Sequence, residues 1–170
     1  MTVRIQKPAF NIREKLSELE FGHVPYEKMP AGSVIQVKCV TRNSDLALNT
    51  SSVWTNIDSI VFTPKFSNSL LELSVDYSSG SNTGGVESYW RFLHDLNGEI
   101  ERTGKFVSVS DQSQDVWTSR NNWTHFYYPN STRTSTYTYQ FFRVAGTGIL
   151  YAHSYGDQAT STFTIKEIKQ

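Results

Sequence analysis

The sequence has little of several features that define well-known classes of protein. It contains one cysteine, Cys39, in 170 residues, which excludes an internal disulfide framework. Basic and acidic residues number 16 each, so a broad basic surface for nucleic acid is not expected. No apolar run reaches the roughly 18 residues of a membrane span. The first residues also lack the apolar stretch of a secretory signal peptide. We therefore expect a soluble chain that neither binds nucleic acid nor inserts into a membrane.

Motifs of catalytic chemistry are missing as well. The chain has no phosphate loop, dinucleotide fingerprint, zinc-ligand spacing or nucleophile elbow. The pair His94-Asp95 precedes a turn signal and is interpreted as a turn pair. Glu99 and Glu101 are two residues apart on a predicted strand, and we expect them on one face of it. Cys39 lies in an alternating apolar stretch and is interpreted as an inert core thiol. No catalytic residue, metal site or cofactor is predicted, and the protein is not expected to be an enzyme.

The residues that are abundant favour β-structure. Aromatic residues make up 14% of the chain, and with many threonines and valines they favour sheet over helix. Alternating runs such as "SVIQVKCV", "SLLELSVDY" and "STFTIKEI" are separated by turn signals. Among these, "LNGE" and "AGTG" predict tight hairpins and "SSGSNTGG" predicts a flexible stretch. About eight strands are predicted over residues 31–170, which is typical of a β-sandwich or jelly roll.

Residues 1–30 differ from this pattern and are predicted to form an N-terminal arm. A capping-box pattern starts one short amphipathic α-helix at about residues 11–20. Its apolar residues Ile12, Leu16 and Leu19 share one face. Isolated helices shorter than about 12 residues are marginal in water. The stripe must therefore pack on something, either the β-domain of the same chain or another protein.

An aromatic segment near residue 125 is the best candidate for ligand binding. Trp123, His125, Tyr127 and Tyr128 offer flat apolar surfaces with polar tips, which suit a saccharide or a protein surface. About half of the side chains of a strand point into the core, however. Core packing is therefore the favoured interpretation of this segment, ahead of glycan or receptor binding.

The first twenty residues, "MTVRIQKPAFNIREKLSELE", resemble the N-terminal segment of many tail-fibre-like and other structural proteins of tailed bacteriophages, especially phages of marine bacteria. In that group, the segment precedes quite different C-terminal regions, as an interchangeable virion-docking tag would. The resemblance implies that the arm docks on other virion proteins. The candidate docking residues are Phe10, Ile12, Arg13, Leu16 and Leu19.

The remaining sequence is similar to a β-rich phage virion module that opens with a "GSVIQV"-like stretch and ends near "STFTIKEI". That module resembles a jelly roll, and the resemblance implies a homotrimer at the tip of a virion appendage. Here the arm joins the β-module almost directly, so a short fibre, a knob or a head decoration is favoured over a long fibre.

The sequence thus predicts a non-enzymatic structural protein of a tailed-phage virion, assembled in the host cytoplasm. A short tail fibre or tip-like appendage, with a host surface glycan or protein as its target, is the first interpretation. A capsid decoration or head fibre protein is an alternative from the same class. A free carbohydrate-binding, lectin-like domain is the alternative from a different class.

Overall fold

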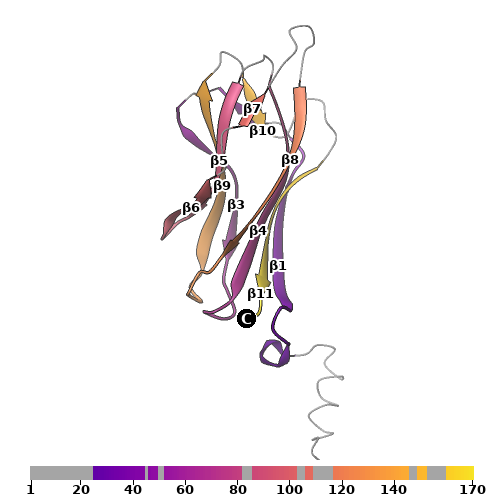
Figure 1. The fold of residues 1–170 in the computed structure, drawn as a ribbon, viewed down its shortest axis with the longest axis vertical. Coiled ribbons are helices and arrows are strands. Elements are labelled where there is room, and N and C mark those ends of the chain that lie inside the picture. The colour runs from indigo at the N-terminus through magenta and orange to yellow at the C-terminus, as the bar shows by residue number, and fades with distance from the viewer. Residues whose placement is uncertain are drawn as a thin grey trace, which may run out of the picture.

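The computed structural model describes residues 25–44, 46–49, 52–81, 86–102, 106–108, 117–145, 149–152 and 160–170. These residues form eleven strands and one short 3-10 helix. The strands build two antiparallel sheets that pack face to face (Figure 1). The predicted β-sandwich is therefore confirmed, whereas the helix predicted at residues 11–20 lies outside the described residues. No helix in the described ranges is long and apolar enough to cross a bilayer.

The first sheet, sheet A, is organised around its longest strand. Its members are β1 (Val34–Arg42), β11 (Ser161–Ile168), β4 (Leu70–Ser81), β8 (Trp117–Tyr127), β10 (Leu150–Ala152) and β2 (Leu46–Leu48). One edge of β4 pairs first with β11 and then with β10, while β8 follows the other edge from Leu71 to Ser81. The lower part of sheet A therefore runs in the order β1–β11–β4–β8.

The second sheet, sheet B, has the strand order β3–β9–β5–β6, and β7 also pairs with β5. Its members are β3 (Trp54–Phe62), β9 (Ser135–Ala145), β5 (Val86–His94), β6 (Gly98–Arg102) and β7 (Phe106–Ser108). β5 and β6 are joined by a three-residue turn, and β6 begins directly after it at Gly98, whose φ of +77° suits glycine. The predicted "LNGE" hairpin is thus confirmed.

Two of the turn predictions are wrong because pairing between distant strands overrides local sequence. The "AGTG" segment follows β9, but β9 pairs with β3 and β5 in sheet B while β10 pairs with β4 and β2 in sheet A. It therefore does not close a hairpin between those strands. The "SSGS" part of the stretch expected to be flexible continues β4, where residues 78–81 are buried and pair with β8.

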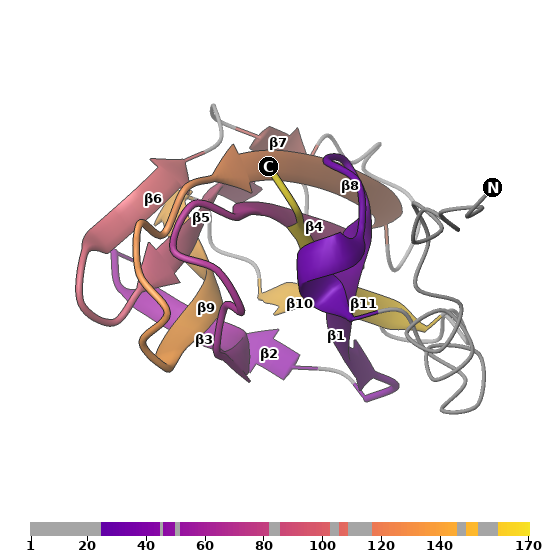
Figure 2. The ribbon, with the colours of Figure 1, turned by 90° about the horizontal axis from the view of Figure 1, so that it is seen from below.

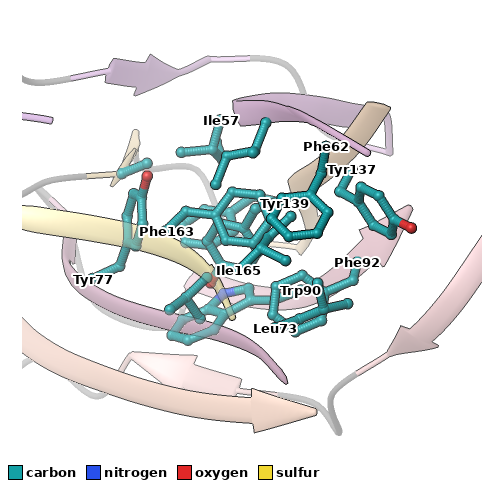
Figure 3. Close-up of a cluster of buried hydrophobic side chains, with 14 of the residues drawn as sticks. Ile57, Phe62, Leu73, Tyr77, Trp90, Phe92, Tyr137, Tyr139, Phe163 and Ile165 are labelled. Carbon is teal, nitrogen blue, oxygen red and sulfur yellow. The ribbon is translucent and has the colours of Figure 1, made fainter. Parts of the chain in front are cut away.

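The core fills the space between the two sheets and is rich in aromatic rings (Figure 3). Phe92 lies at its centre, with its ring stacked on Phe163 at 5.6 Å and on Trp123 at 4.4 Å between centroids. Strict alternation supplies these inward side chains: every second residue of β11 is buried, from Ser161 to Glu167. Aromatic and β-branched residues at those positions explain why the sequence forms a sandwich.

The β1 and β3 edges of the two sheets are joined by side chains. Three long polar residues of β1 donate hydrogen bonds to backbone oxygens along β3 and just after it: Gln36 Nε2 to Thr63 O at 2.7 Å, Lys38 Nζ to Val61 O at 2.9 Å and Arg42 Nη2 to Ile57 O at 2.6 Å. β1 is thus an edge strand. Between these residues, Cys39 is exposed, so its interpretation as a core thiol is wrong. Its Sγ accepts a hydrogen bond from Thr164 Oγ1 at 3.4 Å on the outer face of sheet A.

Candidate functional site

The aromatic segment proposed from the sequence forms the end of β8, the edge strand of sheet A (Figure 1). Trp123 stacks on Phe92 of the opposite sheet, with 4.4 Å between ring centroids. The Tyr127 hydroxyl accepts a hydrogen bond from Asn97 Nδ2 at 2.6 Å, in the β5–β6 turn. Both rings are half-buried against the core. These two residues therefore connect sheet A to sheet B along this edge of the sandwich.

His125 lies between these two residues and makes a third link between the sheets. Its Nδ1 is 3.8 Å from Glu101 Oε2 on β6, and its side chain is 26% exposed. Phe126 and Tyr128 are 54% and 51% exposed. The structure therefore divides the four predicted binding residues: three line the sandwich edge and one, Tyr128, is open to solvent. Their role in binding a glycan or receptor stays a prediction.

Glu99 and Glu101 serve different partners, so the expectation that they share one face is wrong. Between Phe92 and Leu93 on β5, the pairing register with β6 shifts from Glu101 to Glu99, which marks a β-bulge. The extra residue changes the alternation along β6. Glu101 reaches His125 in sheet A, whereas Glu99 accepts hydrogen bonds from Arg91 in its own sheet.

His94 stabilises the β5–β6 turn, in agreement with the prediction that His94 and Asp95 form a turn pair. Its Nδ1 accepts hydrogen bonds from the backbone N–H groups of Leu96 at 3.3 Å and Asn97 at 3.0 Å. Burial lowers the pKa of the imidazole, and Asp95 opposes this shift. The ring therefore favours its neutral form. A neutral His94 positions Asn97 for its contact with Tyr127.

Residues 25–30, the described part of the predicted arm, lie at the end of the sandwich where β11 finishes, seen from below in Figure 2. Here the short helix η1 (Tyr26–Lys28) is followed by a tight connection into β1. Lys169 Nζ donates to three carbonyl oxygens of this connection: Tyr26 O at 3.1 Å, Glu27 O at 2.6 Å and Met29 O at 2.6 Å. Its backbone also pairs with Gly32 N and Ser33 O. The start of the sandwich and its last strand are thus fastened together. We call this end the arm pole.

The predicted docking residues Phe10, Ile12, Arg13, Leu16 and Leu19 lie outside the described residues. Their roles stay predictions. Within the described ranges, no group of three or more ligating side chains is placed to hold a metal ion.

A partly buried charged cluster joins three strands, β1, β3 and β4. Arg42 of β1 donates from Nη2 to Asp58 Oδ1 at 3.0 Å, and the Tyr77 hydroxyl of β4 donates to the other oxygen of the same carboxylate. The pKa of Tyr77 is raised far above its ordinary value, mainly by burial and then by the bond to Asp58. The three side chains bind one another, which indicates a structural role for the network.

One surface cluster was missed by the sequence analysis. It lies on the outer face of sheet B and is centred on Trp54, whose ring centroid is 4.0 Å from Arg91 Cζ and 5.2 Å from Arg102 Cζ. Tyr89 and Arg91 stand at alternate positions of β5, a pattern that indicates that their side chains share the outer face of the strand. The alignment of that face with Trp54, three strands away from Arg102, depends on strand register, which the sequence does not supply.

Comparison with known proteins gives no family. No family model and no curated protein matches the sequence. Similar solved structures include that of the infectious bursal disease virus Gx strain, with a TM-score of 0.47 and 8% identity, covering 80% of this chain and 33% of that one. Another is the infectious bursal disease virus VP2 subviral particle, with a TM-score of 0.41 and 10% identity, covering 81% of this chain and 34% of that one. The chain therefore spans about a third of the length of these viral chains, and at this level of similarity no family or function is transferred from them.

Proposed function

We propose that the chain is a non-enzymatic structural protein of a tailed-phage virion, displayed as a short tail fibre or tip-like appendage and attached through its N-terminal arm. The observation that carries the proposal is the fastening of the arm to the end of β11 by Lys169. A fixed exit from one pole lets a rigid domain project from a particle in a defined direction. The resemblance of the first twenty residues to virion-docking segments supports the same arrangement.

The strand order supports a jelly roll as the displayed domain. Along the chain, the principal strands alternate between the sheets except at the β5–β6 hairpin: β1, β4, β8 and β11 belong to sheet A, and β3, β5, β6 and β9 to sheet B. The neighbours β1–β11–β4–β8 and β3–β9–β5–β6 are those that two interlocking Greek keys produce. Jelly rolls are common in viral capsid and lectin domains, and so the fold suits a particle component without specifying where on the particle it lies.

Immunogold labelling of intact virions with an antibody against residues 32–170 tests the proposal. Gold clustered at the tail supports a fibre or tip-like appendage. Gold spread over the head replaces this version with a capsid decoration or head fibre protein, whose copy number per particle is far higher. Particles without gold contradict the proposal and favour the free lectin, for which residues 31–170 alone must bind saccharide.

The docking role of the arm is tested by a double substitution, Leu16→Asp with Leu19→Asp. We expect the variant to fold and to be lost from purified particles, because two charges interrupt the apolar stripe. The matched control is Val37→Asp with Val61→Asp, since both side chains are 54% exposed on the sandwich. A Leu16/Leu19 variant that remains on particles at the wild-type level would show that the arm is not the anchor.

A further inference from the structure

The cluster around Trp54 contains two arginines that share one carboxylate. Arg91 on β5 and Arg102 on β6 are directly opposite each other in the antiparallel pair. Arg91 Nη1 and Arg102 Nη2 both donate to Glu99 Oε2 at 2.9 Å. Both guanidinium groups also lie against the indole ring of Trp54, at 4.0 Å and 5.2 Å from its centroid. Among these three charged side chains, one positive charge remains in excess.

A chain of hydrogen bonds holds Arg91 in place from the other side. Arg91 Nε donates to Gln140 Oε1 at 2.7 Å, and Gln140 Nε2 donates to Asn56 Oδ1 at 2.5 Å. Since these residues lie on β5, β9 and β3, the polar row crosses sheet B up to the strand that carries Trp54. Side chains fixed in this way lose little conformational freedom when a ligand binds, which favours binding.

Arg102 is the member of the cluster that is open to solvent. Its side chain is 46% exposed, compared with 17% for Arg91. Among the described residues, its guanidinium group makes one hydrogen bond, from Nη2 to Glu99 Oε2. A guanidinium group has five N–H donors in a planar fork. Arg102 therefore offers further donors beside the Trp54 ring.

We propose that the Trp54 cluster binds a carboxylate-bearing saccharide. The Arg102 fork matches the geometry of a carboxylate, which it binds through paired, charge-assisted hydrogen bonds. Arg91 and Phe142 pack on the half-buried Trp54 ring, and the part of the indole that they leave uncovered supplies an apolar contact for the C–H groups of a sugar ring beside the fork. Arg91 acts as a positioning residue, because it fixes the indole and shares Glu99 with Arg102.

Two other kinds of partner fit the cluster less well. A nucleic acid needs a broad basic surface, whereas this cluster has two arginines and a neighbouring Glu99, in a chain of net charge +0. A stable protein partner buries an apolar interface core. Among the large apolar side chains exposed in the described ranges, Val53 is the one next to Trp54 in the sequence, and the Trp54 ring itself is half-buried, so the apolar surface here is small.

The cluster lies far from the arm pole. Trp54 is the first residue of β3, and Phe62, the last, precedes the loop at the arm pole. Eight steps along a strand separate them by about 25 Å. On a displayed appendage the cluster is thus kept clear of the anchored end. In this sense the inference rests on the proposed function and adds a chemical class of host target.

The test is isothermal titration of the purified full chain with trigalacturonic acid and with 3′-sialyllactose. The methyl ester of trigalacturonic acid is the matched ligand without charge. The variant is Arg102→Gln, and the matched control is Arg120→Gln, an arginine on the outer face of sheet A that is 53% exposed and is paired with Asp76. We expect at least one acid to bind, and Arg102→Gln to weaken it at least about tenfold, the value of one charge-assisted hydrogen bond. Arg120→Gln should bind as the wild type does.

Absence of binding by both acids up to about 10 mM overturns the proposal, because a contribution of one carboxylate contact is measurable in that range. Equal binding of the acid and its methyl ester overturns it too, as does equal loss in Arg102→Gln and Arg120→Gln. If the cluster bound a protein and neither acid, the proposed saccharide ligand would be wrong and a protein ligand would take its place. The titration uses no particles, so its failure leaves the immunogold result on virion location untouched.

Discussion

The rings of Tyr77 and Tyr139 lie in the core with 5.1 Å between their centroids, yet their hydroxyl groups have opposite environments. The Tyr77 hydroxyl donates to the carboxylate of Asp58, which Arg42 also binds. The Tyr139 hydroxyl is buried and has no hydrogen-bond partner within the described ranges. Burial raises the pKa of Tyr139 well above its ordinary value, so this hydroxyl stays neutral. Two chemically identical groups on neighbouring rings should therefore contribute to stability with opposite signs.

This difference predicts opposite effects of the same substitution. Tyr139→Phe removes an unsatisfied buried hydroxyl and should raise the free energy of unfolding by about 1 kcal/mol. Tyr77→Phe removes a donor to a charged group and should lower it by roughly 1.5–3 kcal/mol. Urea denaturation of both variants measures the two values. Shifts of the same sign would contradict this assignment of the two hydroxyls.

Glu167 provides a second stability prediction. This fully buried carboxylate accepts four hydrogen bonds, from Gln36 Nε2 at 2.6 Å, Lys65 N at 2.8 Å, Phe66 N at 3.2 Å and Ser69 Oγ at 2.5 Å. Glu167→Ala leaves buried donors unpaired and should cost about 3 kcal/mol or more. The control is Glu72→Ala, which breaks a partly exposed ion pair with Lys166 and should cost under about 1 kcal/mol. Thermal unfolding of the two variants compares them, and equal costs would exclude a special role of the buried carboxylate.

Acid should weaken the sandwich through His94. The pKa of this imidazole is lowered below its ordinary value of 6.5, mainly by burial, and protonation would remove the acceptor for Leu96 N and Asn97 N. The unfolded chain therefore takes up the proton first. The contribution of His94 is fully present above about pH 6.5 and is lost as the pH falls through that value toward the lower pKa of the folded state.

The variant that isolates this effect is His94→Asn, because the Asn Oδ1 occupies the place of the Nδ1 acceptor and does not titrate. We expect a lower stability at pH 7.5 from lost packing on Tyr137, but a smaller loss between pH 7.5 and pH 5 than in the wild type. Guanidinium denaturation at both pH values measures the two slopes. Identical losses would assign the acid sensitivity to groups other than His94.

The arm pole makes a prediction about local opening. Lys169→Met removes three hydrogen bonds to the backbone around η1, so tryptic cleavage after Lys28 should become faster. The melting temperature of the sandwich should change little, because the core is untouched. Lys38→Met is the matched control, since Lys38 also donates to a backbone oxygen but lies on the β1–β3 edge. If cleavage after Lys28 became equally faster in both variants, the hydrogen bonds of Lys169 would not be what holds this segment in place.

Local pattern predicted much of the fold where it agreed with long-range pairing. The alternation of "STFTIKEI" appears in β11 as strictly alternating burial, and "LNGE" forms its turn around Gly98. Residues 78–81 have weak strand propensity, but β8 and β10 pair with them on both edges and override it. Cys39 has the composition of a core residue, but β1 is an edge strand and Cys39 faces outward.

The candidate sites depended more strongly on register than the fold did. Simple alternation along β8 predicts that Trp123, His125 and Tyr127 share one face, so assigning Trp123 to the core places the other two on the inward side as well. Glu99 and Glu101 did not, because a bulge on β6 changes the alternation between them. Trp54 and Arg102 are 48 positions apart in the sequence and meet only across the width of sheet B.

The side chains of β1 that bind the backbone of β3 also protect this edge of the sandwich from pairing with another chain. A free strand edge with unpaired carbonyl groups is a template for another chain. Gln36, Lys38 and Arg42 occupy three such carbonyl groups, so an incoming strand must first displace them. The β3 edge is therefore insulated against sheet extension. Copies of the domain held close together would therefore not join their sheets through the β3 edge. Any contact between them on this side would be made by side chains rather than by backbone hydrogen bonds.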